Sequence, residues 1–100
     1  MKQKEIIHFL QEIKPQFQTI DKMALFGSYA KHQEEICSDI DIAFKFKSQF
    51  LHTCDPWEYF NILERLKTEL YNRFKVKIDL FDLDSSSPYK EQIAKEGIYV

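Results

Sequence analysis

Glycine, proline and cysteine are scarce in this sequence, and none of its apolar stretches is long. Two glycines and three prolines in 100 residues exclude a collagen-like or low-complexity chain. The longest apolar run falls far short of the roughly 20 residues that span a bilayer. We therefore expect no membrane segment and, because the N-terminus is polar, no secretory signal. Two cysteines, Cys37 and Cys54, are too few for a disulfide scaffold and fit a cytoplasmic protein.

An excess of basic residues is also missing. The formal net charge is −2, with 14 Lys and Arg against 16 Asp and Glu. Proteins that coat DNA or bind anionic membranes usually carry a basic surplus, so we expect neither direct DNA binding nor membrane binding. The composition is typical of a soluble globular domain, because 44% of the residues are hydrophobic. Aromatic residues make up 15% of the chain. The length predicts a single domain over residues 1–100.

The first half of the chain predicts one helix and two strands. Apolar residues recur at spacings of three and four from Ile6, and Pro15 places the end of this helix near Ile13. Met23–Phe26 is a short apolar run before a glycine, which predicts a buried strand. Asp39–Phe46 alternates between apolar and mostly polar residues, the pattern of a strand with one face on the core.

The second half predicts the longest helix, a third strand and a short closing segment. Asp55 followed by Pro56 is a helix start, and apolar residues continue at helical spacing to Phe74. Val76–Phe81 alternates again as a strand, and a short helix from Pro88 to Gly97 precedes a last short strand. We predict an α+β fold, with a small mixed β-sheet and helices packed on one face.

Three aspartates are candidates for a metal site. Asp39 and Asp41 are two residues apart on a predicted strand, so their side chains leave the same face, and Asp79 takes the corresponding place on the next strand. Carboxylates this close repel one another unless a cation lies between them, and hard oxygen ligands favour Mg²⁺ or Mn²⁺. Alternating polar residues are more often the solvated face of a sheet. Asp82 and Asp84 are alternative third carboxylates, although they approach a serine-rich turn.

A Gly-Ser pair follows the first predicted strand. Gly27 allows the backbone to turn sharply and approach a ligand, and Ser28 offers a hydroxyl at the start of a short predicted helix over Tyr29–Lys31. Taken alone, a Gly-Ser pair is usually an ordinary turn.

The two motifs together resemble a known family. Gly27-Ser28 is followed by Ala30 and Lys31, and Ser38-Asp39-Ile40-Asp41 begins eleven residues after Gly27. This pattern resembles the minimal nucleotidyltransferases (the MNT family), a compact branch of the DNA polymerase β-type nucleotidyltransferase superfamily. The resemblance extends over nearly the whole chain.

The resemblance implies a role for each motif residue. Asp39 and Asp41 would bind two Mg²⁺ ions and the triphosphate of ATP, and Asp79 would bind metal and help to deprotonate the acceptor hydroxyl. The nucleotide would be held by Gly27, Ser28, Lys31 and Ser38. His32 departs from the pattern, because the family usually has Gly at this position, and a positive φ there would strain a histidine.

The resemblance also implies a function and a partner. Members of this family are typically paired with a HEPN-type toxin and act as its antitoxin by AMPylation of a tyrosine, that is, by transferring AMP from ATP. Larger superfamily members carry a further helical domain, so we expect the rest of this active site on another chain. Alternatives are a transferase for a small molecule such as an aminoglycoside, or a non-catalytic module that neutralises a partner by binding it. Assembly of the chain into a homo-oligomer is a further alternative.

Overall fold

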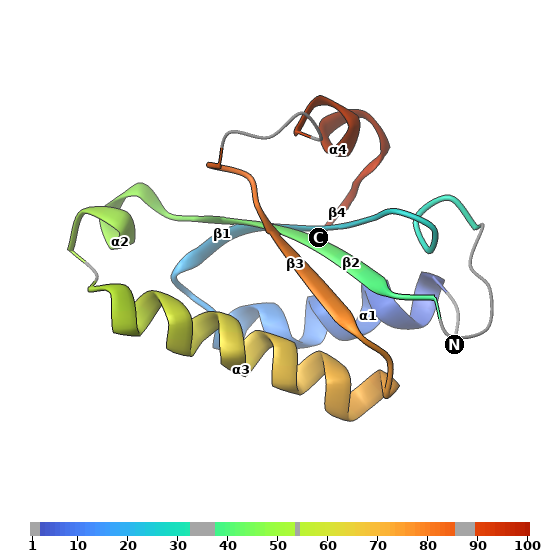
Figure 1. The fold of residues 1–100 in the computed structure, drawn as a ribbon, viewed down its shortest axis with the longest axis horizontal. Coiled ribbons are helices and arrows are strands. Elements are labelled where there is room, and N and C mark those ends of the chain that lie inside the picture. The colour runs from blue at the N-terminus through green and yellow to red at the C-terminus, as the bar shows by residue number, and fades with distance from the viewer. Residues whose placement is uncertain (1–2, 33–37, 54, 86–89) are drawn as a thin grey trace.

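The computed structural model describes residues 3–32, 38–53, 55–85 and 90–100. It is an α+β fold with a four-stranded mixed sheet, as predicted (Figure 1). The elements follow one another as α1 (Gln3–Ile13), a 3₁₀ turn η1 (Lys14–Gln16), β1 (Ile20–Phe26), β2 (Ile40–Phe46), α2 (Ser48–Thr53), α3 (Pro56–Phe74), β3 (Ile78–Asp82), α4 (Lys90–Glu96) and β4 (Ile98–Tyr99).

The strand order in the sheet is β3-β2-β1-β4. β1 pairs antiparallel with both β2 and β4, whereas β2 pairs parallel with β3. A parallel pair needs a crossover connection, and α2 and α3 together provide it. β2 therefore lies between β1 and β3, and its residues have partners on both sides.

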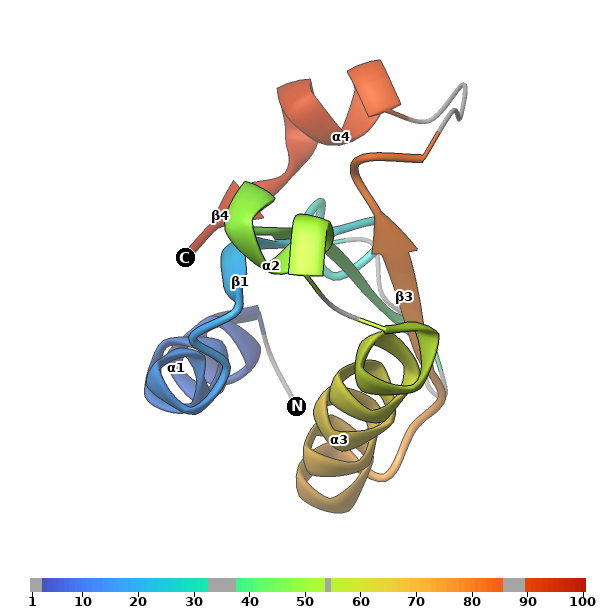
Figure 2. The same ribbon diagram turned by 90° about the vertical axis from the view of Figure 1, so that its left-hand side faces the viewer.

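Two long helices cover one face of the sheet. α1 and α3 lie side by side beneath it in Figures 1 and 2. The main core is formed between these helices and the sheet, and its fully buried members include Ile6, Leu10, Leu66, Leu70, Ile40, Ile42, Phe44 and Phe46. The period-two pattern of the second strand thus correctly predicted that its apolar side chains face the core.

The short helix α4 departs from the expectation that the helices pack on one face. It lies on the opposite side of the sheet from α1 and α3 (Figure 2). There Ile93 is buried in a second, smaller cluster with Ala24, Ala43 and Leu83. The two alanines leave room for a helix to approach this face, which explains why Ala43, expected on the polar side of its strand, is fully buried.

The predicted helix ends agree with the structure where they can be compared. α1 ends at Ile13, and Pro15 falls in the 3₁₀ turn that follows. Asp55 caps α3, because its Oδ1 accepts a hydrogen bond of 2.9 Å from the Glu58 N–H. Pro56 occupies the first helical position, where a missing N–H costs nothing.

Some details differ from the sequence expectations. β1 begins at Ile20, three residues before the apolar run, and α2 was not predicted. Trp57 and Phe60 remain 77% and 60% exposed, so the core contacts of α3 are concentrated in its second half.

Within the described residues we find no helix long and apolar enough to cross a membrane. Cys37, Cys54 and the predicted helix start at Pro88 lie outside the described residues.

Candidate active site on the sheet

Two carboxylates lie next to each other on neighbouring strands. Asp41 of β2 is the register partner of Asp79 of β3. On its other side, Asp41 is the register partner of Phe26 at the end of β1. Register partners leave a sheet on the same side, so these side chains share the face opposite α1 and α3. We call this side, which carries Asp41, Asp79, Phe26 and Phe81, the carboxylate face.

The third predicted carboxylate is linked to this pair through a lysine. The Lys77 Nζ lies 3.9 Å from Asp39 Oδ2 and 3.7 Å from Asp79 Oδ1. The Ile40 N–H donates a 3.0 Å hydrogen bond to the Lys77 carbonyl, which fixes the starts of β2 and β3 beside each other. Asp39 and Asp79 thus flank a single ammonium group.

The three aspartates do not converge as closely as the sequence suggested. The described residues contain no group of three or more His, Cys, Asp or Glu side chains that could hold one metal ion. Instead, the Lys77 ammonium lies within 4 Å of both Asp39 and Asp79, so a positively charged side chain is already present beside these two carboxylates. The strands are neighbours as expected, and Asp41 and Asp79 are register partners across them.

The electrostatics of Asp41 reflect this crowding. Partial burial, followed by the negative charges of Asp79 and Asp39, raises the pKa of the Asp41 carboxyl from its ordinary value of 3.8 to about 6. Lys77 acts in the opposite direction and lowers this pKa. Asp41 therefore lies in a place that disfavours its own negative charge and favours a cation close to it.

Gly27 turns the chain directly beside Asp41. Its φ of 75° is in the left-handed region, and a Cβ built on it would overlap the Asp41 carboxylate. Glycine is thus required both by the backbone angle and by the space available. The backbone at the end of β1 consequently lies against a carboxylate, where a ligand could contact both.

The segment after Gly27 is a turn and not the short helix expected over Tyr29–Lys31. Its backbone hydrogen bonds include one of α-helical type, from the Lys31 N–H to the Gly27 carbonyl at 3.2 Å, and one of 3₁₀ type, from the His32 N–H to the Tyr29 carbonyl at 3.4 Å. The Gln3 side chain of α1 donates to the Ala30 carbonyl at 2.8 Å, and Tyr29 is buried in the main core. The turn is thus anchored to α1 and to the main core.

The last described residue of this turn is His32, with a φ of 56°. A positive φ at this position, which would strain a histidine, is therefore confirmed: His32 adopts the left-handed conformation that glycine accepts most easily. Its neighbour Lys31 forms an ion pair with Glu96 of α4, with 2.9 Å between Nζ and Oε2. This contact joins the turn to α4.

The remaining predicted site residues lie near the pair or away from it. Ser28 and Ser38 are half-buried, the first in the turn and the second just before Asp39. The Asp82 carboxylate accepts a 2.6 Å hydrogen bond from the Tyr59 hydroxyl, and Asp84 lies 3.6 Å from Lys45 Nζ. The two alternative third carboxylates are thus engaged elsewhere, and Asp79 is the one beside Asp41.

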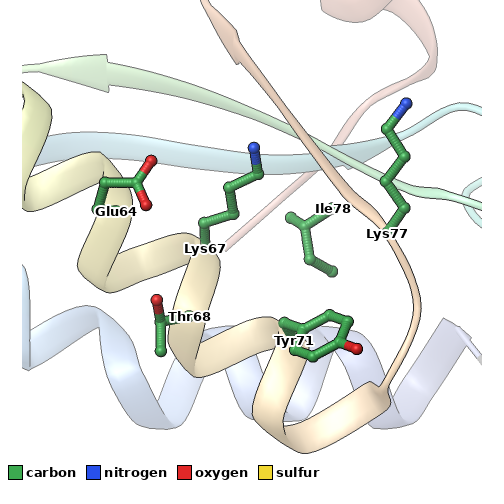
Figure 3. Close-up of a pocket in the computed structure, with 6 residues that line it drawn as sticks. All are labelled: Glu64, Lys67, Thr68, Tyr71, Lys77 and Ile78. Carbon is green, nitrogen blue, oxygen red and sulfur yellow. The ribbon is translucent and has the colours of Figure 1, made fainter.

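A groove borders the site on its other side. It lies between α3 and the edge strand β3, has a volume of about 450 Å³, and is lined by Glu64, Lys67, Thr68, Tyr71, Lys77 and Ile78. In Figure 3 the Ile78 side chain points toward the Tyr71 ring, while Lys67 and Lys77 extend away from α3. Lys77 belongs both to this groove and to the ion pairs with Asp39 and Asp79.

Sequence reasoning missed three residues that shape the site: Lys77, Gln3 and Glu96. Lys77 could have been found, because it lies two residues before Asp79 and alternation places both on one face. Gln3 and Glu96 act on the turn from more than 20 residues away in the sequence, and no local signal marks them.

A small mixed sheet with paired carboxylates beside a glycine turn is the architecture expected of a nucleotidyltransferase. The family model described as "Polymerase beta, Nucleotidyltransferase" matches residues 4–100. The chain therefore belongs to this family, as the motifs predicted.

Relatives extend this result. The chain is similar to a Methanocaldococcus jannaschii protein named "Putative protein adenylyltransferase MJ1217". The two are 30% identical over 97% of this chain and 93% of that protein. It is also similar to a chain of a toxin–antitoxin crystal structure with AMP-PNP, with a TM-score of 0.63, 26% identity and coverage of 99% of this chain and 72% of that one. A chain of a tri-AMPylated Shewanella oneidensis HEPN toxin in complex with MNT antitoxin gives a TM-score of 0.53 and 26% identity, covering 97% and 66%.

Proposed function

We propose that this nucleotidyltransferase transfers AMP from ATP to a protein hydroxyl, and that its acceptor is a tyrosine of a HEPN-type toxin. Modification would silence the toxin, so the chain would act as an antitoxin. The name of the M. jannaschii relative and the toxin–antitoxin structures similar to this chain support the choice of acceptor class. The structural observation that carries the proposal is the contact between Gly27 and Asp41, next to Asp79.

That contact suits a triphosphate. At Gly27 no side chain blocks the approach of phosphate oxygens to the backbone, and the Ser28 hydroxyl follows directly. The adjacent carboxylates would repel a bare triphosphate, so a cation must accompany it. Lys31 and Ser38 lie on the two segments that flank this position and complete the set we assign to nucleotide binding.

The donor chemistry fits divalent cations. Carboxylate oxygens are preferred ligands of Mg²⁺, and partial burial together with the charges of Asp79 and Asp39 raises the pKa of Asp41, so a cation here would stabilise its ionised form. We assign Asp39, Asp41 and Asp79 as the residues that would hold the ions. Bound there, Mg²⁺ supplies charge stabilisation for both the attacking and the leaving oxygen of a phosphoryl transfer.

The protein residues would then act mainly by positioning. The acceptor oxygen attacks the α-phosphorus in line, the bond from that phosphorus to the bridging oxygen breaks, and pyrophosphate leaves. Asp79 is assigned to take the proton from the acceptor hydroxyl. Gly27 and Ser28 keep the β- and γ-phosphates in place, which aligns the leaving group.

Transfer of differently labelled ATP tests the proposal. The chain is incubated with Mg²⁺, a HEPN-domain protein encoded beside it, and ATP labelled on either the α- or the γ-phosphate. We expect label on the HEPN protein from α-labelled ATP only, because the γ-phosphate leaves with pyrophosphate.

Two substitutions provide the comparison. Asp39→Asn should reduce labelling by at least about 100-fold, as expected for loss of a group that stabilises the transition state. Asp84→Asn is the matched control, since this exposed carboxylate pairs with Lys45 and should leave labelling unchanged. Labelling that survives Asp39→Asn contradicts the mechanism. A complex that forms without labelling favours the non-catalytic binding module instead.

A further inference from the structure

An aromatic pair lies beside the carboxylates. Phe26 is the register partner of Asp41, and Phe81 follows Asp79 by two residues on the same strand. The two rings meet edge to face, with 6.1 Å between their centroids and 75° between their planes. Both are only partly buried. The carboxylate face thus carries an apolar platform directly next to the acidic pair.

Helix α4 covers one edge of this platform. A pocket of about 180 Å³ lies between α4 and the end of β1, lined by Phe26, Gly27, Gln92, Ile93 and Glu96. This is smaller than the roughly 300–1,000 Å³ of sites that enclose a drug-sized ligand, so it fits one flat ring system. Because Gly27 lines both this pocket and the proposed phosphate position, one ligand can reach both.

The polar wall of the pocket is formed by two exposed side chains of α4 that contact each other, Gln92 and Glu96. The Gln92 Nε2 donates a 3.2 Å hydrogen bond to Glu96 Oε2, and the same oxygen accepts the Lys31 ammonium at 2.9 Å. In this arrangement the bond to Glu96 uses one of the two protons of the Gln92 amide. A carbonyl oxygen and a second proton are the groups with which an amide reads adenine, which presents an amine next to a ring nitrogen.

We propose that this pocket binds the base of the nucleotide and that Gln92 selects adenine. The inference rests on the proposed function, since it assigns a base site to the same nucleotide. Phe26 supplies the apolar surface for the ring, Ile93 closes the pocket from α4, and Gln92 pairs with the adenine edge. Base selection is then a property of this chain and not of a partner.

Binding of three probes in the presence of Mg²⁺ tests the inference by calorimetry. The probes are ATP, GTP and inorganic tripolyphosphate, which has no base. We expect the parent protein to bind ATP at least tenfold more tightly than either of the others. Gln92→Ala should weaken ATP binding by about tenfold, the usual effect of losing a two-point contact to a base. It should leave the affinity for tripolyphosphate unchanged.

Further variants separate a binding role from a folding defect. Phe26→Leu keeps an apolar side chain and should also weaken ATP without affecting tripolyphosphate. Gln11→Ala, an exposed glutamine of α1, is the matched control and should alter no affinity. Equal binding of ATP and tripolyphosphate to the parent, or an equal loss of both in Gln92→Ala, overturns the base site alone. If neither ATP nor tripolyphosphate binds to the parent protein, the proposed function fails together with the base site.

Discussion

Asp41 lies in a position that disfavours the ionised form of its carboxyl group. It is flanked by Asp79 across the strand pair, and its pKa is raised to about 6 by partial burial and by the two other carboxylates. In the folded protein without metal, the neutral form of Asp41 is therefore favoured relative to the unfolded chain. Its ionisation lowers stability, and a bound cation would reverse that effect.

Asp41→Asn should stabilise the metal-free protein in a pH-dependent way. A raised pKa means that the folded protein holds this proton more tightly, so the Asp41 contribution to stability is present below about pH 4. It is lost as the pH rises toward 6. The variant should match the parent near pH 4 and exceed it above pH 6 by about 1 kcal/mol, after allowance for solvent screening of a half-exposed group.

Urea unfolding in EDTA at a series of pH values measures this difference. Asp84→Asn, which removes an exposed carboxylate outside the site, serves as the control and should show no such rise. A stability gap for Asp41→Asn that is constant with pH would contradict the assigned electrostatics.

Single residues of the site were predictable where they follow a strand period. The alternation of the second and third strands places Asp41 and Asp79 on one face without any tertiary information, and the structure has them as partners. The expected convergence with Asp39 was not predictable in the same way. The position of Asp39 involves Lys77, whose contacts with two carboxylates arise only when the starts of β2 and β3 meet.

At the scale of elements, the turn after β1 tolerates an unfavourable residue. His32 and Lys75 are the two non-glycine residues with positive φ among the described positions, at 56° and 58°. Lys75 is the C-cap of α3, where a left-handed residue is common, whereas His32 lies in the turn that begins at Gly27. Both positions store backbone strain that glycine would relieve.

His32→Gly and Lys75→Gly should each raise the free energy of unfolding by up to about 1 kcal/mol. The left-handed conformation costs most residues about 1–2 kcal/mol, and the extra freedom of glycine in the unfolded chain offsets part of the gain. The two variants form a matched pair, since only His32 lies in the turn next to the site. Thermal unfolding measures both. Destabilisation by His32→Gly would show that its imidazole makes a contact worth more than the strain.

The elements that sequence reasoning misplaced are those set by tertiary contacts. A short helix was expected over Tyr29–Lys31, yet the segment is a turn held by Gln3 and by burial of Tyr29, neither of which has a local signature. α4 was expected with the other helices, but Ala24 and Ala43 create space for it on the opposite face. In contrast, α3 was predicted with its cap, because Asp55 and Pro56 act within one turn.

For the whole molecule, the strand order explains how so small a fold assembles a site. Its radius of gyration of 13.1 Å is that of a compact domain of this size. β2 is an inner strand, so Asp41 meets Gly27 at the end of β1 on one side and Asp79 of β3 on the other. The base pocket is then completed by α4 on the same face.

The most direct test of the assigned site is the change in melting temperature on adding Mg²⁺ and ATP together. A ligand at one hundred times its Kd stabilises a protein by about 2.7 kcal/mol, which corresponds to roughly 10 °C or more for a domain of this size. We predict a rise of this order for the parent and for Asp84→Asn, and none for Asp41→Asn. An equal rise in all three proteins would contradict the assignment of Asp41 to the nucleotide and metal site.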